Sequence, residues 1–299
     1  MLEEASGTSG ECTVLAVSSG IGGILDLLDL EPIEVNIFRG HSFEEGRDRV
    51  FGGQVAAQAL VAASRTVRDD LRLHSLHAYF LRPGDPAAPI LYEVDRIRDG
   101  RSFATRRVVA IQHGTAIFNL ACSFHVEEEG LEHATAMPDV PRPETLPVTE
   151  VPEDRRVGTP FKYLDEHGLE IRFVDGPLWT RNGELRDREQ LWFRARAPLE
   201  DDPIVHLAIV TFISDAALIS TIVQRHGMSL WTSEFFAASL DHCMWFHRPV
   251  RADQWLLFDQ ASPVAHGALG LTFGSLFDES GELVASVAQE GLVRLKGGS

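Results

Sequence analysis

The sequence is organised around the stretch Ser239-Leu240-Asp241-His242-Cys243-Met244-Trp245-Phe246-His247-Arg248-Pro249, which has a counterpart upstream. That counterpart is Leu73-His74-Ser75-Leu76-His77-Ala78-Tyr79-Phe80-Leu81-Arg82-Pro83, and it ends in the same Arg-Pro pair. Proline lacks the backbone N–H that a central strand must donate, so each stretch is typical of a strand that stops at its proline. Because a repeat within one chain indicates duplication, the sequence predicts two similar units.

Length and composition are those of an ordinary globular protein. The chain has 299 residues, 44% hydrophobic and 24% charged, which is enough for about two domains. Its formal net charge of −17 disfavours binding to nucleic acids, which are polyanions. We expect no membrane span, because no apolar run is predicted to reach the roughly 20 residues that one needs. The acidic start and three widely spaced cysteines favour a cytoplasmic protein with reduced thiols.

The first unit is predicted to pair one buried helix with an antiparallel sheet. Residues 1–23 are expected to be an N-terminal extension, and a short helix is expected at about 24–30. The helix over 53–65 is rich in alanine and apolar nearly all round, as a helix enclosed on every side must be. Strand patterns occupy about 35–40, 73–82, 89–98 and a hairpin near 102–126. A helix wrapped by such a sheet is the hotdog arrangement, here over residues 24–126.

The second unit repeats this order. Residues 127–165 carry six prolines and are predicted to be a stiff linker between the units. In residues 166–299, a long apolar helix is expected over 203–220. Strands are expected near 169–174 and 191–196, in the opening stretch, and at 254–264, 267–277 and 283–295. The predicted fold class is α+β, a double hotdog of two fused units.

Three polar residues of the second unit are candidates for chemistry. Asp215 is the one acidic residue of the apolar 203–220 segment, where burial raises the pKa of a carboxyl group and makes it a stronger base. It could equally cap a local break in the backbone or face solvent. Ser239 opens the Asp-His strand, where a serine commonly bonds to the backbone. Gln289 ends an apolar strand, where its amide could orient a water or a carbonyl, or bond a neighbouring strand.

Five groups of residues together resemble the acyl-CoA thioesterase II (TesB-type) family. They are Phe38-Arg39-Gly40; 49–54 with 57–60; 74–77 with 80–84; 239–242 with 244–249; and 284–286 with 289–291, covering the chain from about residue 24 to its end. The resemblance implies a double-hotdog hydrolase that cleaves acyl-CoA without a covalent intermediate. By position it implies that Asp215, Ser239 and Gln289 are the catalytic residues. Asp215 would then accept a proton from a water that the other two hold.

Substrate contacts are predicted at Gly53, Gln54, His74 and Arg248. Backbone N–H groups at a helix start, near Gly53 and Gln54 or near residues 213–216, could stabilise the oxyanion. His74 and His77 have near-neutral reference pKa values, but both also suit strand histidines with structural hydrogen bonds. The phosphates of CoA require cations, for which the possibilities are Arg82, Arg225, Arg248 and Arg251.

No cofactor or metal is expected, because the 12 histidines form no cluster at metal-ligand spacing with cysteines or carboxylates. The 53–65 helix carries no counterpart of Asp215, so one working site per chain is predicted. The expected partner is acyl-CoA, and the resemblance implies a homo-oligomer.

Two other functions stay open from sequence. A hotdog enoyl-CoA hydratase would need an Asp and a His acting together, but Asp241 and His242 are neighbours on a strand and point to opposite faces. A non-catalytic acyl-CoA-binding module would have the same fold and pocket but would not hydrolyse the thioester.

Overall fold

The computed structural model describes residues 20–43, 48–151, 160–180, 183–229 and 235–296. Residues 1–19 of the predicted extension, the loop 44–47 and residues 152–159 of the predicted linker lie outside them. The elements of the first unit are α1 (Ile21–Leu28), β1 (Glu31–Glu34), β2 (Ile37–Gly40), α2 (Gly52–Ser64), β3 (Leu71–Phe80), β4 (Ile90–Asp99), β5 (Phe103–Gln112) and β6 (Thr115–Val126).

Two predictions for the first unit need correction. The short helix α1 begins at Ile21, inside the segment assigned to the extension. The strand predicted over 35–40 is a turn followed by β2, because Asn36 has a φ of 62°. This left-handed conformation suits asparagine and reverses the chain, so that β1 and β2 form a hairpin.

After β6 the chain runs through a 3₁₀ turn, η1 (Pro143–Thr145), to the second unit. Its elements are α3 (Pro160–Glu166), β7 (Leu169–Phe173), η3 (Leu178–Thr180), β8 (Arg188–Ala195), α4 (Pro203–Ser214), α5 (Leu218–Gln224), β9 (Phe235–Ser239), β10 (Asp241–Phe246), β11 (Leu256–His266), β12 (Leu269–Asp278) and β13 (Leu283–Leu295). The helix predicted over 203–220 is therefore two helices, and the opening stretch is the end of β9 and all of β10. Helix α3 occupies the end of the segment predicted to be linker.

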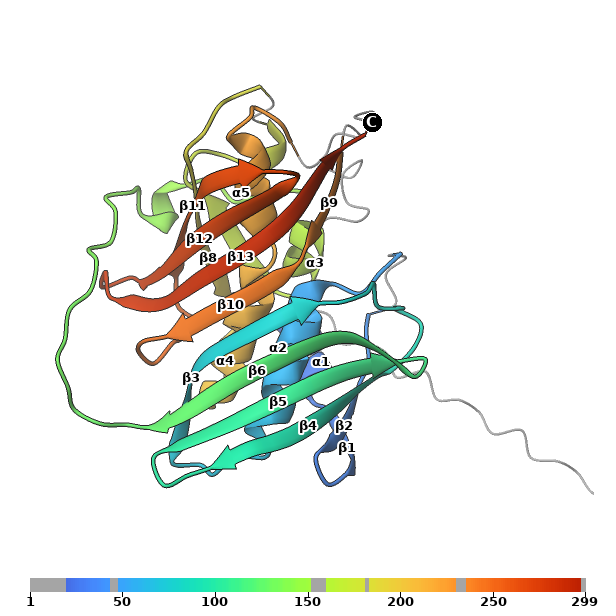
Figure 1. Ribbon diagram of the computed structural model, residues 1–299. Coiled ribbons are helices and arrows are strands. Elements are labelled where there is room, and N and C mark those ends of the chain that lie inside the picture. The colour runs from blue at the N-terminus through green and yellow to red at the C-terminus, as the bar shows by residue number, and fades with distance from the viewer. Residues whose placement is uncertain (1–19, 44–47, 152–159, 181–182, 230–234, 297–299) are drawn as a thin grey trace, which may run out of the picture.

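The strands form one continuous antiparallel sheet, in which the two copies of the repeated stretch lie side by side (Figure 1). Strand β10 pairs with β3 at the centre, with Cys243 opposite His77 and Met244 opposite Leu76. Beyond this seam the order runs through β6, β5, β4, β2 and β1 on one side, and through β13, β12, β11, β8 and β7 on the other. The repeat thus joins the two units edge to edge.

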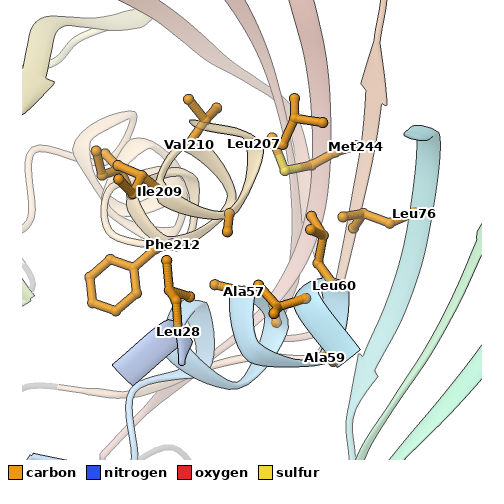
Figure 2. Packing of buried hydrophobic residues seen from close by; sticks show 14 of the residues in the cluster. Leu28, Ala57, Ala59, Leu60, Leu76, Leu207, Ile209, Val210, Phe212 and Met244 are labelled. Atoms are coloured by element: carbon orange, nitrogen blue, oxygen red, sulfur yellow. The ribbon is translucent and has the colours of Figure 1, made fainter. Parts of the chain in front are cut away.

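Helices α2 and α4 pack against each other on the inner face of the sheet. Figure 2 shows side chains from both helices and from the central strands pointing into one core, among them Ala57, Leu60, Leu76, Phe212 and Met244. All five have at most 1% of their surface exposed. Each buried Leu, Phe or Met side chain stabilises the fold by about 2 kcal/mol. The alanines of α2 allow α4 to approach closely.

The segment Pro203–Gln224 is, among the described residues, long and apolar enough to cross a membrane by length and composition alone. The expectation that no apolar run reaches that length is therefore wrong. However, 83% of its most apolar window is buried inside the fold. Its apolar surface packs against the sheet and α2, as the surface of a core helix does.

Candidate active site

Asp215 stands at the break between α4 and α5. Helix α4 ends at Ser214, and the next helix begins only at Leu218. No glycine or proline lies between them, but the Ser220 hydroxyl donates to the carbonyl oxygen of Ala217, and the Ser214 hydroxyl oxygen lies 2.9 Å from that of Thr211. Such back-bonding to a preceding turn competes with regular helix hydrogen bonds. Asp215 therefore does sit at a backbone break, as one interpretation of the sequence had it.

The carboxylate of Asp215 receives hydrogen bonds from two residues far away in the sequence. Ser239 Oγ donates to Asp215 Oδ1 over 3.0 Å, and Gln289 Nε2 donates to the same oxygen over 2.7 Å. Ser239 is the last residue of β9, and Gln289 lies on β13, with which β9 pairs. The structure thus brings together the three residues that the sequence singled out.

Burial raises the pKa of Asp215 from 3.8 to about 6. Hydrogen bonds from Gln289, Ser239 and the Gly53 backbone N–H, together with the charge of Arg49, act in the opposite direction. The residue keeps partial exposure because it lines a cavity, while protein surrounds the carboxylate on its other sides. At neutral pH Asp215 is an ionised base of increased strength.

The start of α2 lies directly against this carboxylate. A Cβ added to Gly52 would stand 2.6 Å from Asp215 Oδ2, and one added to Gly53 would stand 2.3 Å from the carbonyl oxygen of Phe212. The N-cap residue, Phe51, offers no side-chain acceptor to the helix. The first N–H groups of α2 are therefore left to the Asp215 carboxylate and to whatever enters beside it.

A cavity of about 730 Å³ opens beside Asp215 and Ser239. Both units line it, and most of its wall is apolar, including Phe51, Val55, Phe80, Leu81, Ile117, Phe161, Ile219, Phe235 and Phe236. Three cationic residues, Arg49, Arg82 and Lys296, also line it. The guanidinium of Arg49 stacks 5.9 Å from the centre of the Phe236 ring. The volume of this cavity is typical of a site that binds a small molecule.

Two predicted contacts of the first unit lie elsewhere. Gln54 is buried and bonds to the His41 carbonyl and the Ser42 hydroxyl, so it ties a loop to α2 and does not line the cavity. His74 faces Ser123, with 2.9 Å between Nε2 and Oγ, and burial lowers the pKa of its imidazole. It lies six residues before Phe80 on β3, about 20 Å along the strand from the cavity. Both therefore hold structure together.

Arg248 does not line the cavity either, and it pairs with Glu132 and Glu282. Two further arginines proposed for phosphate binding are held by acidic partners: Arg225 by Asp187, and Arg251 by Asp201 and Asp253. Arg82 alone of that set lines the cavity. Arg49 and Lys296 were missed, although Arg49 stands next to the Phe51-Gly52-Gly53 segment.

In the part of the chain that the structure describes, no group of three or more His, Cys, Asp or Glu residues is placed to hold a metal ion. The first unit offers no second carboxylate at the matching place. There the residue after α2 is Arg65, whose guanidinium bonds to the Leu30 carbonyl and to Asp29.

Comparison with known proteins points to one family. Family models match the acyl-CoA thioesterase domain over residues 166–292 and the acyl-CoA thioesterase N-terminal domain over residues 42–125. Acyl-coenzyme A thioesterase 8 of Mus musculus is 41% identical over 91% of this chain and 89% of its own. Acyl-CoA thioesterase 2 of Haemophilus influenzae is 37% identical over 93% of this chain and 99% of its own.

Solved structures give the same result. The acyl-CoA thioesterase II TesB2 from Mycobacterium marinum is 42% identical and superposes with a TM-score of 0.78 over 92% of this chain and all of its own. A protein from Alicyclobacillus acidocaldarius, described as having a hot dog fold, superposes with a TM-score of 0.75 at 21% identity over 91% of this chain and 98% of its own. The predicted double hotdog is confirmed. The chain belongs to the acyl-CoA thioesterase II, or TesB-like, family.

Proposed function

We propose that this chain, an acyl-CoA thioesterase by family, hydrolyses fatty acyl-CoA to a free fatty acid and CoA by direct attack of water on the thioester. The observation that carries this proposal is the pair of hydrogen bonds from Ser239 and Gln289 to one oxygen of a carboxylate with a raised pKa. A bonded group of this kind, with Asp215 and Ser239 at the wall of an apolar cavity and Gln289 behind them, is what a water-activating site requires.

Asp215 is the general base in this mechanism. Its Oδ1 accepts two hydrogen bonds, while Oδ2 faces Gly52, whose missing side chain leaves room beside it. A water there loses one proton to the carboxylate as its oxygen bonds to the thioester carbon. The C–S bond then breaks, and the CoA thiolate takes the proton back from Asp215. Water thus ends up divided between the carboxylic acid and the thiol, and Asp215 is regenerated.

The developing oxyanion needs hydrogen-bond donors. The N–H groups at the start of α2 are suited to this, because the positive end of the helix dipole points the same way. Gly52 and Gly53 carry no side chain that could keep an acyl group from approaching them. Helix α2 belongs to the first unit, so each unit contributes a different part of the site.

The cavity suits both parts of an acyl-CoA. Its aromatic and aliphatic wall would take the acyl chain, at about 25 cal/mol for each Å² removed from water. Arg49, Arg82 and Lys296 would face the CoA phosphates. In a chain with a formal net charge of −17, a cavity lined by three cationic residues against the two acidic residues Asp48 and Asp215 has a local excess of positive charge, which favours an anionic ligand.

The rival functions have less support. A hydratase would need an imidazole at the cavity, but the fully buried His242 is directed at Ser214, and Asp241 accepts the backbone N–H of Glu290. A binding module would have no use for a buried carboxylate of raised pKa. The test is release of free CoA, read with a thiol reagent, from acetyl-, octanoyl- and palmitoyl-CoA. Hydrolysis of one or more supports the proposal, and binding without any thiol release would leave the binding module.

A homo-oligomer and a cytoplasmic location complete the proposal. The outer face of the central strands exposes aromatic surface at Tyr79 and Phe273, which are 58% and 52% exposed. Tyr79 lies in the β3–β10 seam and Phe273 lies on β12, two strands beyond β10, so this face has apolar surface that a second copy would cover. Light scattering coupled to size exclusion measures the assembly, and cell fractionation measures the location.

A further inference from the structure

His242 is a buried residue that the mechanism above does not use, although it lies in the layer directly behind the site. None of its surface is exposed. Strand β10 pairs with β13 with Cys243 opposite Ala288, which sets His242 beside Gln289 on the inner face. Its Nε2 atom lies 2.8 Å from the Oγ of Ser214, the residue that precedes Asp215. Ser214, His242, Gln289 and Asp215 therefore form a continuous row.

The donor and the acceptor of each hydrogen bond in this row can be assigned. Gln289 Nε2 donates to Asp215, while Gln289 Oε1 and His242 Nδ1 are both buried without a hydrogen-bond partner of good geometry. The Gln289 side chain is nevertheless close enough to raise the pKa of His242. A proton on Nδ1 would face Oε1 and satisfy both atoms. In a neutral imidazole Nε2 then accepts, and Ser214 donates to it.

The opposite order of donors is unfavourable. If Ser214 gave its single proton to the Thr211 carbonyl, at 2.9 Å, His242 Nε2 would have to donate and Nδ1 would be an acceptor. With Nδ1 as an acceptor, there are two outcomes. Either the lone pairs of Nδ1 and Gln289 Oε1 face and repel each other, or the Gln289 amide rotates by 180° so that its NH₂ group donates to Nδ1. The turned amide would present its oxygen to the Asp215 carboxylate. Both results weaken the ionised state that a general base needs.

We propose that His242, assisted by Ser214, is a positioning residue that holds the Gln289 amide with its N–H group toward Asp215. The proposal rests on the proposed function, because it assigns Gln289 the task of orienting the base. Burial lowers the pKa of His242 to about 4, so the imidazole is neutral at the pH of the reaction, as the row requires. Replacing His242 should leave substrate binding intact and change the acidity of Asp215.

Few groups surround these four residues, so a change in the pKa of Asp215 on replacing His242 can be traced to its cause. Asp215 is approached by Ser239 from β9, Gln289 from β13 and the Gly53 N–H from α2. The charged residues lining its cavity are Asp48, Arg49, Arg82 and Lys296. His242 is approached by Ser214 and Gln289, and neither of them carries a charge. A shift caused by His242 must therefore pass through Gln289 or Ser214.

The experiment compares His242→Phe with His242→Asn in the full chain. Phenylalanine removes both ring nitrogens, whereas the amide nitrogen of asparagine can replace Nδ1 as a donor to Gln289. The Asp215 carboxyl is titrated by ¹³C NMR and assigned by its absence in Asp215→Asn. We expect the midpoint to rise by about one pH unit in His242→Phe, the effect of losing one hydrogen bond to a charged group. His242→Asn should restore most of the difference.

Kinetics supply the second measurement. For His242→Phe, kcat should fall about tenfold with KM unchanged. The fall should disappear when Gln289→Ala is already present, because His242 acts through Gln289. Ser214→Ala, the milder change, should move the midpoint in the same direction and serves if the phenylalanine variant does not fold. A folded His242→Phe or Ser214→Ala protein with an unmoved midpoint would overturn the proposal. Since the titration needs no turnover, this failure is distinct from absence of hydrolysis by the wild-type chain.

Discussion

Gln289 donates a hydrogen bond of 2.7 Å to the carboxylate of Asp215, although 74 residues separate the two along the chain. The contact exists because α4 stops at Ser214 and because β13 runs beside β9, whose last residue, Ser239, donates to the same oxygen. The duplicated fold supplies the rest, since the start of α2 in the first unit closes the other side of the carboxylate. One site is thus assembled from both halves.

The pH dependence of kcat/KM should report the ionisation of Asp215. Burial raises its pKa to about 6, and the carboxylate, not the acid, accepts the proton of water. Activity should therefore rise as pH increases through about 6 and level off above it. In Gln289→Ala the midpoint should lie higher, because the lost hydrogen bond lowers the pKa of Asp215 in the native chain. A midpoint near 4 in the wild type would mean that Asp215 is not the titrating base.

Ser239 and Gln289 should act as a unit. Replacing either by alanine should lower kcat by about 10- to 100-fold, the effect of losing a hydrogen bond to a charged group. The double variant should lose less than the product of the two effects, because both donors serve one carboxylate oxygen. Ser239→Thr keeps the hydroxyl and is the control that should stay active. Independent, multiplicative losses would contradict a shared task.

Gly52 should tolerate no side chain. The Cβ of alanine would stand 2.6 Å from Asp215 Oδ2 and 2.7 Å from a ring carbon of Phe80. The carboxylate or the water beside it must then move, and we expect kcat to fall about 10²-fold. Gly130→Ala is the matched control, since its added Cβ meets nothing within 4 Å. Steady-state rates beside circular dichroism would separate the local clash from unfolding, and a fully active Gly52→Ala would exclude the proposed water position.

Arg49 should contribute to binding of the CoA portion. Arg49→Ala removes a cation that lines the cavity, and we expect KM to rise up to about fivefold, as for other exposed charges. The rise should shrink at high ionic strength, because salt screens the lost attraction. Arg248→Ala is the control, since this arginine pairs with Glu132 and Glu282 and does not line the cavity. Equal effects of the two substitutions would argue against a specific role for Arg49.

The sequence was most informative where local pattern and chemistry coincide. The repeated Arg-Pro stretches predicted the duplication, and the apolar helices predicted two cores. Asp215 stood out because a single carboxylate in an apolar segment must have a use or a partner. The sequence left a break at Asp215 as one of several interpretations, because no glycine or proline marks it and serines beside helices are commonplace.

Residues whose role depends on distant partners could not be assigned from sequence. From sequence Arg248 was a reasonable candidate for binding phosphate, but in the structure it pairs with two glutamates. Gln54 lies next to the site in sequence, but its side chain turns away to hold the His41 loop. The turn at Asn36 was hidden because the neighbouring residues alternate as a strand does. In each case the local sequence allowed two roles or conformations, and contacts with residues distant in the sequence determined which one occurs.

The stability of Asp215→Asn provides an internal check on that variant. Between pH 3.8 and about 6 the folded chain keeps a proton on Asp215 that the unfolded chain releases. Wild-type stability therefore falls as pH rises through this window, by up to about 3 kcal/mol. The asparagine variant lacks this loss and should melt at the same temperature as the wild type or higher at neutral pH.

The most direct test is the rate of thiol release from palmitoyl-CoA by Asp215→Asn beside the wild type and Asp259→Asn. Asp259 is a second carboxyl whose pKa burial raises; it is bonded to Gln190 and does not line the cavity, so its variant controls for the loss of a buried acid. We predict that Asp215→Asn loses about 10²- to 10⁴-fold in kcat while remaining folded, and that Asp259→Asn keeps wild-type turnover. A folded Asp215→Asn chain that hydrolyses palmitoyl-CoA at nearly the wild-type rate would contradict the account.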